Sequence, residues 1–239
     1  MSATLVDVLR DAPAIHGPAG ADTLLTHGLL EEALGFIDRT VRDGDRTLET
    51  GSGYSTILFA LRGAHHTCIT PSQVEIDRIR AYCTQRGIST ERLSFHVEVS
   101  EQVLPHRDLG ELDLVIIDGS HSFPQVFLDW FHTASALRVG GHLIVDDVHV
   151  WTGRVLRDFL VAEPEWQLID EFGGRTAVLR KTAESDPNRL WNQQPYVLRN
   201  SHLGARMMAR QSLSMIRHGH SGDLLRRARG VVRSRLRRS

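Results

Sequence analysis

The sequence has little cysteine and no long apolar run. Its 239 residues include two cysteines, Cys68 and Cys83, whose spacing matches no metal-binding motif. No stretch of about eighteen apolar residues is present to cross a membrane, and the first residues lack the basic and apolar regions of a secretory signal. These absences disfavour a disulfide-stabilised secreted domain and an integral membrane protein, and they predict a cytoplasmic location.

The composition is that of an ordinary soluble protein. Apolar residues make up 41% of the chain and charged residues 24%, which excludes a low-complexity or highly charged disordered chain. A chain of 239 residues is long enough for one α/β domain with a sizeable core and some appendages.

Positive charge is concentrated at the end of the chain. Residues 205–239 hold ten arginines and one acid, Asp223, whereas the rest of the chain is net acidic. Three interpretations stay open: a cationic helix on an anionic membrane, a nucleic-acid arm, or an extension that docks on an acidic surface, including that of a second subunit in a homo-oligomer. Aromatic side chains for base stacking are absent after Tyr196, so we favour a disordered tail or a helix docked on the acidic body.

Segments with strand character alternate with segments of helical spacing. We expect strands at 46–50, 65–70, 92–99, 112–118 and 142–147, and helices at 26–42, 55–61, 71–87, 122–139 and 152–161. Two further strands, 165–172 and 175–181, are separated only by Gly173 and Gly174, and so short a loop joins antiparallel neighbours. The sequence therefore predicts an α/β fold with a doubly wound, mostly parallel seven-stranded sheet that ends in an antiparallel hairpin.

Two of the expected helices begin with the pattern of a capping box. Ser72 is followed by Glu75, and Ser122 by Gln125. The second helix is expected to bury one apolar stripe, formed by Val126, Phe127, Trp130, Phe131, Ala134 and Leu137.

A glycine turn follows the first expected strand. Ligands of open α/β sheets bind beyond the carboxyl ends of the strands, and here Glu49, Gly51 and Gly53 form an acid-x-Gly-x-Gly turn. Position 56 is a threonine where the dinucleotide fingerprint has its third glycine, and the turn has no lysine for a phosphate loop. An NAD-type oxidoreductase is therefore the weaker alternative, and a plain tight turn with Glu49 as a helix-start charge stays open.

Two further motifs follow in order, IIDGSHSF and LRVGGHLIVDDV. With the glycine turn, they resemble the class I S-adenosylmethionine-dependent methyltransferases, in particular small-molecule O-methyltransferases of the catechol and macrocin types. The resemblance covers about residues 28–181 and implies a Rossmann-like methyltransferase domain. Residues 1–27 then form an N-terminal segment that is a candidate lid, and residues 182–239 an Arg-rich C-terminal extension.

The resemblance implies roles for several cofactor contacts. Gly51 and Gly53 would let the backbone approach the methionine part of S-adenosylmethionine, and Glu49 would order that region or attract the ammonium. Ser100 is nominated as an adenine contact, although a loop serine also caps its own backbone. An acid that ends the second strand commonly binds the ribose hydroxyls in this family. Thr70 stands there instead, and we assign the nearest acid to its capping box.

Carboxylates end two strands that are expected to be neighbours. Asp118, Asp146 and Asp147 would repel one another unless a cation or a proton offsets them, and they match the positions that hold a divalent cation in the resembling enzymes. The resemblance thus implies Mg²⁺ on these three residues, with Asp118 also near the cofactor and the reaction. Alternatively, Asp118 serves a turn and Asp147 a helix start. Asp146 and Asp147 converge only if the chain turns between them.

Two histidines follow the acidic motifs. His121 and His149 are candidate general bases, because a neutral imidazole accepts a hydroxyl proton near pH 7, and His121 is the better placed of the two. The sequence predicts an S-adenosylmethionine-dependent O-methyltransferase that acts on a hydroxylated small molecule, such as a sugar or an aromatic metabolite. The alternatives are an NAD-type oxidoreductase and a catalytically silent binding protein of the same fold.

Overall fold

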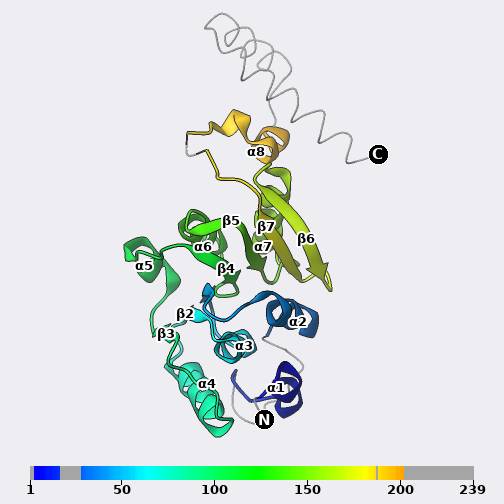
Figure 1. Ribbon diagram of the computed structural model, residues 1–239. Coiled ribbons are helices and arrows are strands. Elements are labelled where there is room, and N and C mark those ends of the chain that lie inside the picture. Colours follow the sequence, from blue (N-terminus) through cyan, green and yellow to red (C-terminus); the bar gives the residue numbers. More distant parts are fainter. Residues whose placement is uncertain (1–2, 17–27, 187, 202–239) are drawn as a thin grey trace, which may run out of the picture.

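The computed structural model describes residues 3–16, 28–186 and 188–201, which form one sheet covered by helices on both faces (Figure 1). Its strands are β1 (Arg46–Thr50), β2 (His65–Ile69), β3 (Leu93–His96), β4 (Leu112–Ile117), β5 (Leu137–Val145), β6 (Trp166–Phe172) and β7 (Thr176–Lys181). Its helices are α1 (Leu5–Asp11), α2 (Glu31–Thr40), α3 (Tyr54–Arg62), α4 (Gln73–Gln85), α5 (Ser100–Val103), α6 (Gln125–Ala134), α7 (Trp151–Ala162) and α8 (Pro195–Asn200), with 3₁₀ turns at Leu104–His106 and Trp191–Gln193.

The seven strands have the order β3-β2-β1-β4-β5-β7-β6. β1 to β5 pair in parallel, and β7 is antiparallel to both β5 and β6, which confirms the predicted fold with its terminal hairpin. The strand order reverses between β1 and β4, where Thr50 is in register with Ile117, and Ile117 in turn with Val145. The carboxyl ends of these three strands therefore meet at one level, beside the point where α/β sheets bind ligands.

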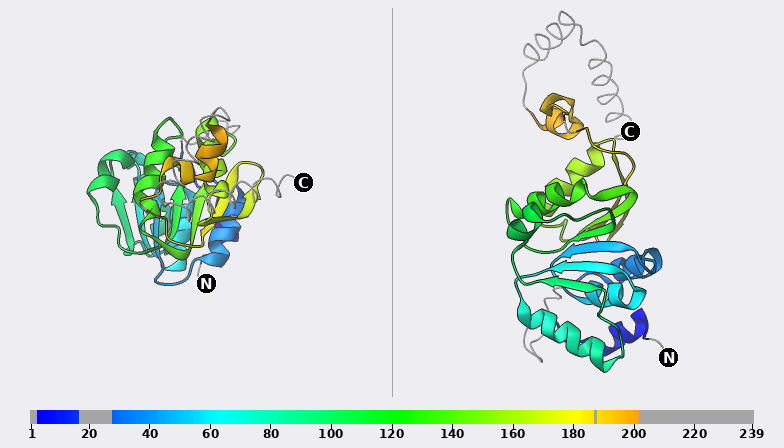
Figure 2. Two further views of the ribbon diagram at one scale, coloured as in Figure 1. Left: turned by 90° about the horizontal axis from the view of Figure 1, so that it is seen from above. Right: turned by 60° about the vertical axis from the view of Figure 1, so that its left-hand side comes forward.

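Apolar residues cover both faces of the sheet. On one face Val115, Ile117, Leu143 and Val145 pack with Val126 of α6 and Leu156 and Leu160 of α7. On the other face Leu114, Ile116, Ile144 and Val178 pack with Leu34 and Ile37 of α2 and Leu58 and Phe59 of α3. Figure 2 shows the resulting layers from two further sides. Strands buried on both faces explain the unbroken apolar run of β4.

The predicted start of the helix after β4 is wrong. α6 begins at Gln125 after Pro124 and has no side-chain cap, and the Ser122 hydroxyl contacts that of Ser120 at 2.8 Å. The Gln125 side chain instead donates to the Ser100 hydroxyl at 2.8 Å. The Gln125 side chain thus binds a residue distant in the sequence and does not cap the helix as the local pattern predicts.

The predicted apolar stripe of that helix is also partly wrong. α6 ends at Ala134, Leu137 begins β5, and the Phe131 side chain is exposed. The carbonyl oxygens of Ala134 and Leu137 accept hydrogen bonds from buried Lys181, the one lysine of the sequence, at 3.0 and 2.7 Å. Pairing of β5 with both β4 and β7 outweighed the helical periodicity in this region.

The two ends of the described chain lie at opposite ends of the sheet, with α1 beside α3 and α4 and α8 beside α7 (Figure 1). Arg189 anchors the C-terminal part, because its guanidinium contacts Glu163 at 2.9 Å and also binds Glu165, and both carboxylates are buried. The first part of the predicted extension is therefore packed on the domain. Its Arg-rich part, from residue 202 on, lies outside the described residues, as do residues 17–27 of the candidate lid.

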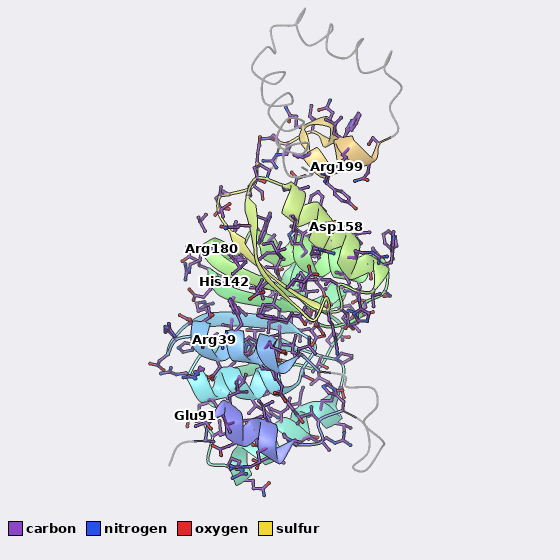
Figure 3. All side chains as sticks on the ribbon, turned by 90° about the vertical axis from the view of Figure 1, so that its right-hand side faces the viewer. Arg39, Glu91, His142, Asp158, Arg180 and Arg199 are labelled. Carbon is purple, nitrogen blue, oxygen red and sulfur yellow. The ribbon has the colours of Figure 1, made fainter. Side chains whose placement is uncertain are left out.

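Two basic side chains lie on the neighbouring strands β5 and β7, away from the strand ends described above. His142 of β5 is in register with Arg180 of β7, and Figure 3 shows the two on the same side of the molecule. Burial, with the charges of Arg180 and Arg138, lowers the pKa of His142.

Within the described residues, no helix combines the length and the apolar character needed to cross a membrane.

Candidate active site

Gly51 carries the chain closely past β4. It has a φ of +99°, and a Cβ atom there would lie 2.3 Å from the carbonyl oxygen of Asp118. Asp118 is held at this level because its N–H donates to the carbonyl of Thr50 at 3.0 Å. Only a glycine fits here, so the glycine turn and the first acidic motif are one structural unit.

Glu49 is buried beneath the glycine turn. One carboxylate oxygen accepts a hydrogen bond from Ser55 at 2.6 Å, and the other binds the Thr56 hydroxyl and contacts His66 at 3.1 Å. Thr56 also accepts the N–H of Gly53 at 3.0 Å. Glu49 therefore orders the turn from within, and Thr56 supplies a polar contact where the dinucleotide fingerprint would have a glycine.

Glu75 extends over the glycine turn instead of completing a capping box. Ser72 accepts the N–H of Glu75 at 3.3 Å, but the Glu75 carboxylate accepts from Ser52 at 2.6 Å and contacts His16 at 3.1 Å. It also lies 3.5 Å from the Thr70 hydroxyl. Burial raises the pKa of Glu75, but the hydrogen bonds from His16 and Ser52 outweigh it and leave this pKa below its ordinary value. The Glu75 carboxylate thus lies beside the end of β2, where the family commonly has an acid and this sequence has Thr70.

The N-terminal segment packs beside the same turn. A Cβ atom on Gly53 would lie 3.4 Å from the Nε2 atom of His16, and Ile15 is buried while its carbonyl accepts from Arg78 at 2.9 Å. The described part of the candidate lid therefore adjoins the glycine turn and Glu75.

Ser100 lies at the start of α5 and is buried against α6. Its hydroxyl accepts from Gln125 at 2.8 Å, and Gln125 also donates to Asp129 at 3.0 Å. Burial raises the pKa of the Asp129 carboxyl, although hydrogen bonds from Ser100 and Gln125 counteract part of this effect. Ser100 is thus tied to a buried polar group, and its contact with adenine stays a prediction.

The three carboxylates converge as the strand ends predicted. Asp147 adopts a left-handed conformation with φ of 52°, so the chain turns between Asp146 and Asp147. Asp146 is fully buried and aligned with β4 by its N–H, which donates to Ile117 at 3.0 Å. Burial raises the pKa of Asp118 well above its ordinary value, and the charges of Asp146 and Asp147 raise it further. Carboxylates this close together repel one another unless a positive charge or a proton offsets them.

A guanidinium from the terminal hairpin lies among them. The Nε atom of Arg175 donates to Asp147 at 2.8 Å, and its Nη2 atom donates to Asp146 at 3.3 Å. Burial lowers the pKa of Arg175, but the charges of Asp146 and Asp147 outweigh this and raise it. Thr176 donates to the other oxygen of Asp146. Sequence reasoning missed Arg175, because a charged residue in a tight turn resembles an ordinary surface residue.

His121 lies against the same carboxylates. Its Nε2 atom is 3.0 Å from Asp147 and 3.8 Å from Asp118, and its carbonyl accepts the Thr152 hydroxyl of α7 at 2.5 Å. His149 is more exposed and its Nδ1 atom lies 3.7 Å from Asp147, which is beyond hydrogen-bond distance. The structure therefore brings both candidate bases to the acids and places His121 closer.

The predicted magnesium site does not fit this arrangement. Arg175 and Thr176 occupy oxygens of Asp146, and Arg175 and His121 occupy those of Asp147. Among the residues that the structure describes, no group of three or more His, Cys, Asp or Glu side chains is arranged to hold a metal ion. Mg²⁺ needs carboxylate oxygens directed at one point, at about 2.1 Å, and here the four oxygens of Asp146 and Asp147 are directed at Arg175, Thr176 and His121.

Part of the sequence matches the model of a known protein family. Residues 48–148 match the family model described as a methyltransferase domain. This part of the chain is therefore similar to a methyltransferase domain. The match begins in β1 and ends just after Asp147, so it contains the glycine turn and both acidic motifs, and it supports the predicted methyltransferase.

Solved structures share the fold of this methyltransferase domain. They include the O-methyltransferase TomG of Streptomyces achromogenes, solved with S-adenosylmethionine (18% identity, TM-score 0.57, 74% of this chain and 90% of that chain). An O-methyltransferase of Bacillus cereus, solved with S-adenosylhomocysteine, is similar (18%, 0.52, 75% and 90%). So is the methyltransferase PaMTH1 of Podospora anserina, solved with the same product (18%, 0.51, 74% and 95%). At these identities the likeness is one of fold, and no curated protein matches the sequence.

Proposed function

We propose that this methyltransferase transfers a methyl group from S-adenosylmethionine to a hydroxyl of a small molecule. The observation that carries the proposal is the His121–Asp147 pair, 3.0 Å apart, at the strand ends next to the glycine turn. A base held beside the expected cofactor position is what transfer to a hydroxyl needs, because a neutral hydroxyl is a weak nucleophile.

Side chains of the protein remove the proton of the acceptor's hydroxyl. In the tautomer that donates Nε2–H to Asp147, His121 has a lone pair on Nδ1 that accepts the hydroxyl proton. Asp147 then stabilises the imidazolium, and Arg175 keeps Asp147 in place at 2.8 Å. When bound, S-adenosylmethionine supplies a methyl group on a positively charged sulfur, which leaves as a neutral thioether with the electron pair of the broken bond. The remaining requirement is alignment of the reacting atoms.

Exposed rings beside His121 support an acceptor with a flat ring. Phe123 and Trp151 are 68% and 56% exposed, and their ring centroids are 6.3 Å apart. Trp151 precedes Thr152, whose hydroxyl binds the His121 carbonyl. Aromatic faces of this kind pack against flat apolar rings and against the C–H faces of sugars, so an aromatic or sugar acceptor fits better than a charged one.

Cofactor binding gives the first test of the proposal. We expect S-adenosylmethionine and S-adenosylhomocysteine to raise the melting temperature in differential scanning fluorimetry, because a ligand that binds only the native state stabilises it by about 2.7 kcal/mol at a hundred times its Kd. NAD should have no effect. Stabilisation by NAD alone would favour the oxidoreductase, and binding without transfer to any acceptor in a labelled-methyl screen would favour a silent binding protein.

Glu75 is the second test, because we propose that its carboxylate accepts hydrogen bonds from the cofactor's ribose hydroxyls. Glu75→Gln keeps the size and loses the charge, so the affinity for S-adenosylhomocysteine should fall by about tenfold, the value of one charged hydrogen bond. Isothermal titration calorimetry measures this fall. A 2′-deoxyribose analogue should bind wild type and variant more equally, and Glu91→Gln, at an exposed position away from the site (Figure 3), is the matched control. An unchanged affinity in Glu75→Gln would assign Glu75 to loop support only.

A further inference from the structure

Two neighbouring carboxylates lie at the end of β5 with every side-chain oxygen engaged. Asp146 binds Thr176 through one oxygen and Arg175 through the other, at 3.3 Å. Asp147 binds Arg175 at 2.8 Å through one oxygen and lies 3.0 Å from His121 through the other. The oxygens that a divalent ion would need are therefore already directed at donors of this chain.

Arg175 is fixed in this position by its backbone. Its carbonyl accepts the N–H of Val148 at 2.8 Å, directly after the two carboxylates, and its N–H donates to Phe172 at 2.9 Å across the hairpin turn. The next residue, Thr176, begins β7. The turn of the hairpin and the loop after β5 are thus joined on both sides of the side chain, which is 20% exposed.

A divalent ion bound to Asp146 and Asp147 would lie in contact with this guanidinium. Two positive charges about 4 Å apart repel strongly where little water screens them. The ion would also have to displace a planar donor that binds two carboxylates at once, which is the geometry that arginine suits best.

We propose that the guanidinium of Arg175 is the resident cation of this carboxylate group, so that the site positions His121 through Asp147 without a divalent ion. Arg175 is then a positioning residue: it contacts Asp147, and Asp147 contacts the base. The part of this inference that concerns His121 rests on the proposed methyl transfer, whereas the exclusion of the divalent ion does not.

Removal of the guanidinium should uncover an ion site. Arg175→Gln leaves Asp146 and Asp147, with Asp118 nearby, without their offsetting charge. Arg175→Lys keeps a positive charge and should keep divalent ions out. Arg180→Gln, which changes the same residue type at the other end of β7 (Figure 3), is the matched control.

Binding of Mn²⁺ to the full-length protein tests the proposal without any acceptor. We expect Mn²⁺ titration, followed by electron paramagnetic resonance of the free ion, to show about tenfold or more tighter binding of one ion to Arg175→Gln than to wild type, Arg175→Lys or Arg180→Gln. The gain should disappear when Asp146→Asn is added. The melting shift with S-adenosylhomocysteine should persist in every variant and shows that each is folded.

Two outcomes would overturn the inference. One is a wild-type protein that binds one Mn²⁺ per chain and loses it in Asp146→Asn, which would restore the divalent-ion site. The other is a folded Arg175→Gln variant with no gain in Mn²⁺ affinity. If the wild-type protein does not bind S-adenosylhomocysteine, the proposed function is contradicted. The Mn²⁺ titration would still test whether Arg175 excludes a divalent ion.

Discussion

Gly51→Ala should abolish the stabilisation by S-adenosylhomocysteine and weaken the fold. The added Cβ atom would lie 2.3 Å from the carbonyl oxygen of Asp118 and 2.9 Å from its carbonyl carbon, both of them backbone atoms. The residue also has a φ of +99°, which an L side chain rarely adopts. To relieve the clash, the ends of β1 and β4 must separate, and this separation displaces the turn that the cofactor contacts.

The expected loss is about 3 kcal/mol in the free energy of unfolding, measured by urea denaturation, because overpacking adds to backbone strain. Gly44→Ala is the matched control, since Gly44 has a similar φ of +84° with nothing within 4 Å. Gly44→Ala should lower the free energy of unfolding by about 1 kcal/mol, from backbone strain alone. The melting shift caused by S-adenosylhomocysteine should stay as large as in wild type. Equal behaviour of the two variants would show that the approach of Gly51 to Asp118 is unimportant for binding.

His121→Ala should lower kcat by about a hundredfold or more, the usual contribution of a positioned general base. Its affinity for S-adenosylhomocysteine should hardly change, because the histidine contacts Asp147 and Asp118 and not the glycine turn. The measurement is the initial rate with a labelled methyl donor and the acceptor found by screening hydroxylated metabolites, together with calorimetric titration of the product.

His149→Ala provides the comparison, since His149 is 58% exposed and 3.7 Å from Asp147. We expect it to retain most of the wild-type rate. If the two variants lose activity equally, or if His149→Ala loses more, the base has been assigned to the wrong histidine. A His121→Ala enzyme with the full wild-type rate would leave no proton acceptor of the kind proposed here.

The backbone of the site could be predicted from the sequence. The strand predicted at 46–50 has the same bounds in the structure. Gly51 is expected to let the backbone approach the cofactor, and the structure adds a second reason for the glycine, the carbonyl of Asp118. The convergence of Asp146 and Asp147 required a turn between them, and the left-handed conformation of Asp147 provides it. These features depend on where the strands end, which hydrophobic patterns indicate well.

The hydrogen-bond partners of the side chains were harder to predict. Glu75 and Gln125 both matched a capping box, yet Glu75 binds Ser52 and His16, and Gln125 binds Ser100. A hydrogen bond within a helix end and one across the fold have similar free energies, so the tertiary neighbours decide between them. Arg175 was missed for a related reason, since its partners lie 28 and 29 residues earlier in the chain.

The position of β7 has a consequence for how the protein is made. β7 lies between β5 and β6 in the sheet although it follows both in the chain. While the ribosome has released only residues up to β6, the edge of β5 has no native partner on one side, and exposed edges of this kind pair readily with other chains. Arg175 and Thr176 also emerge at this late point, so the carboxylates of β5 stay without their cation until then. A nascent chain that stalls before Lys181 should therefore depend on chaperones more than a finished one.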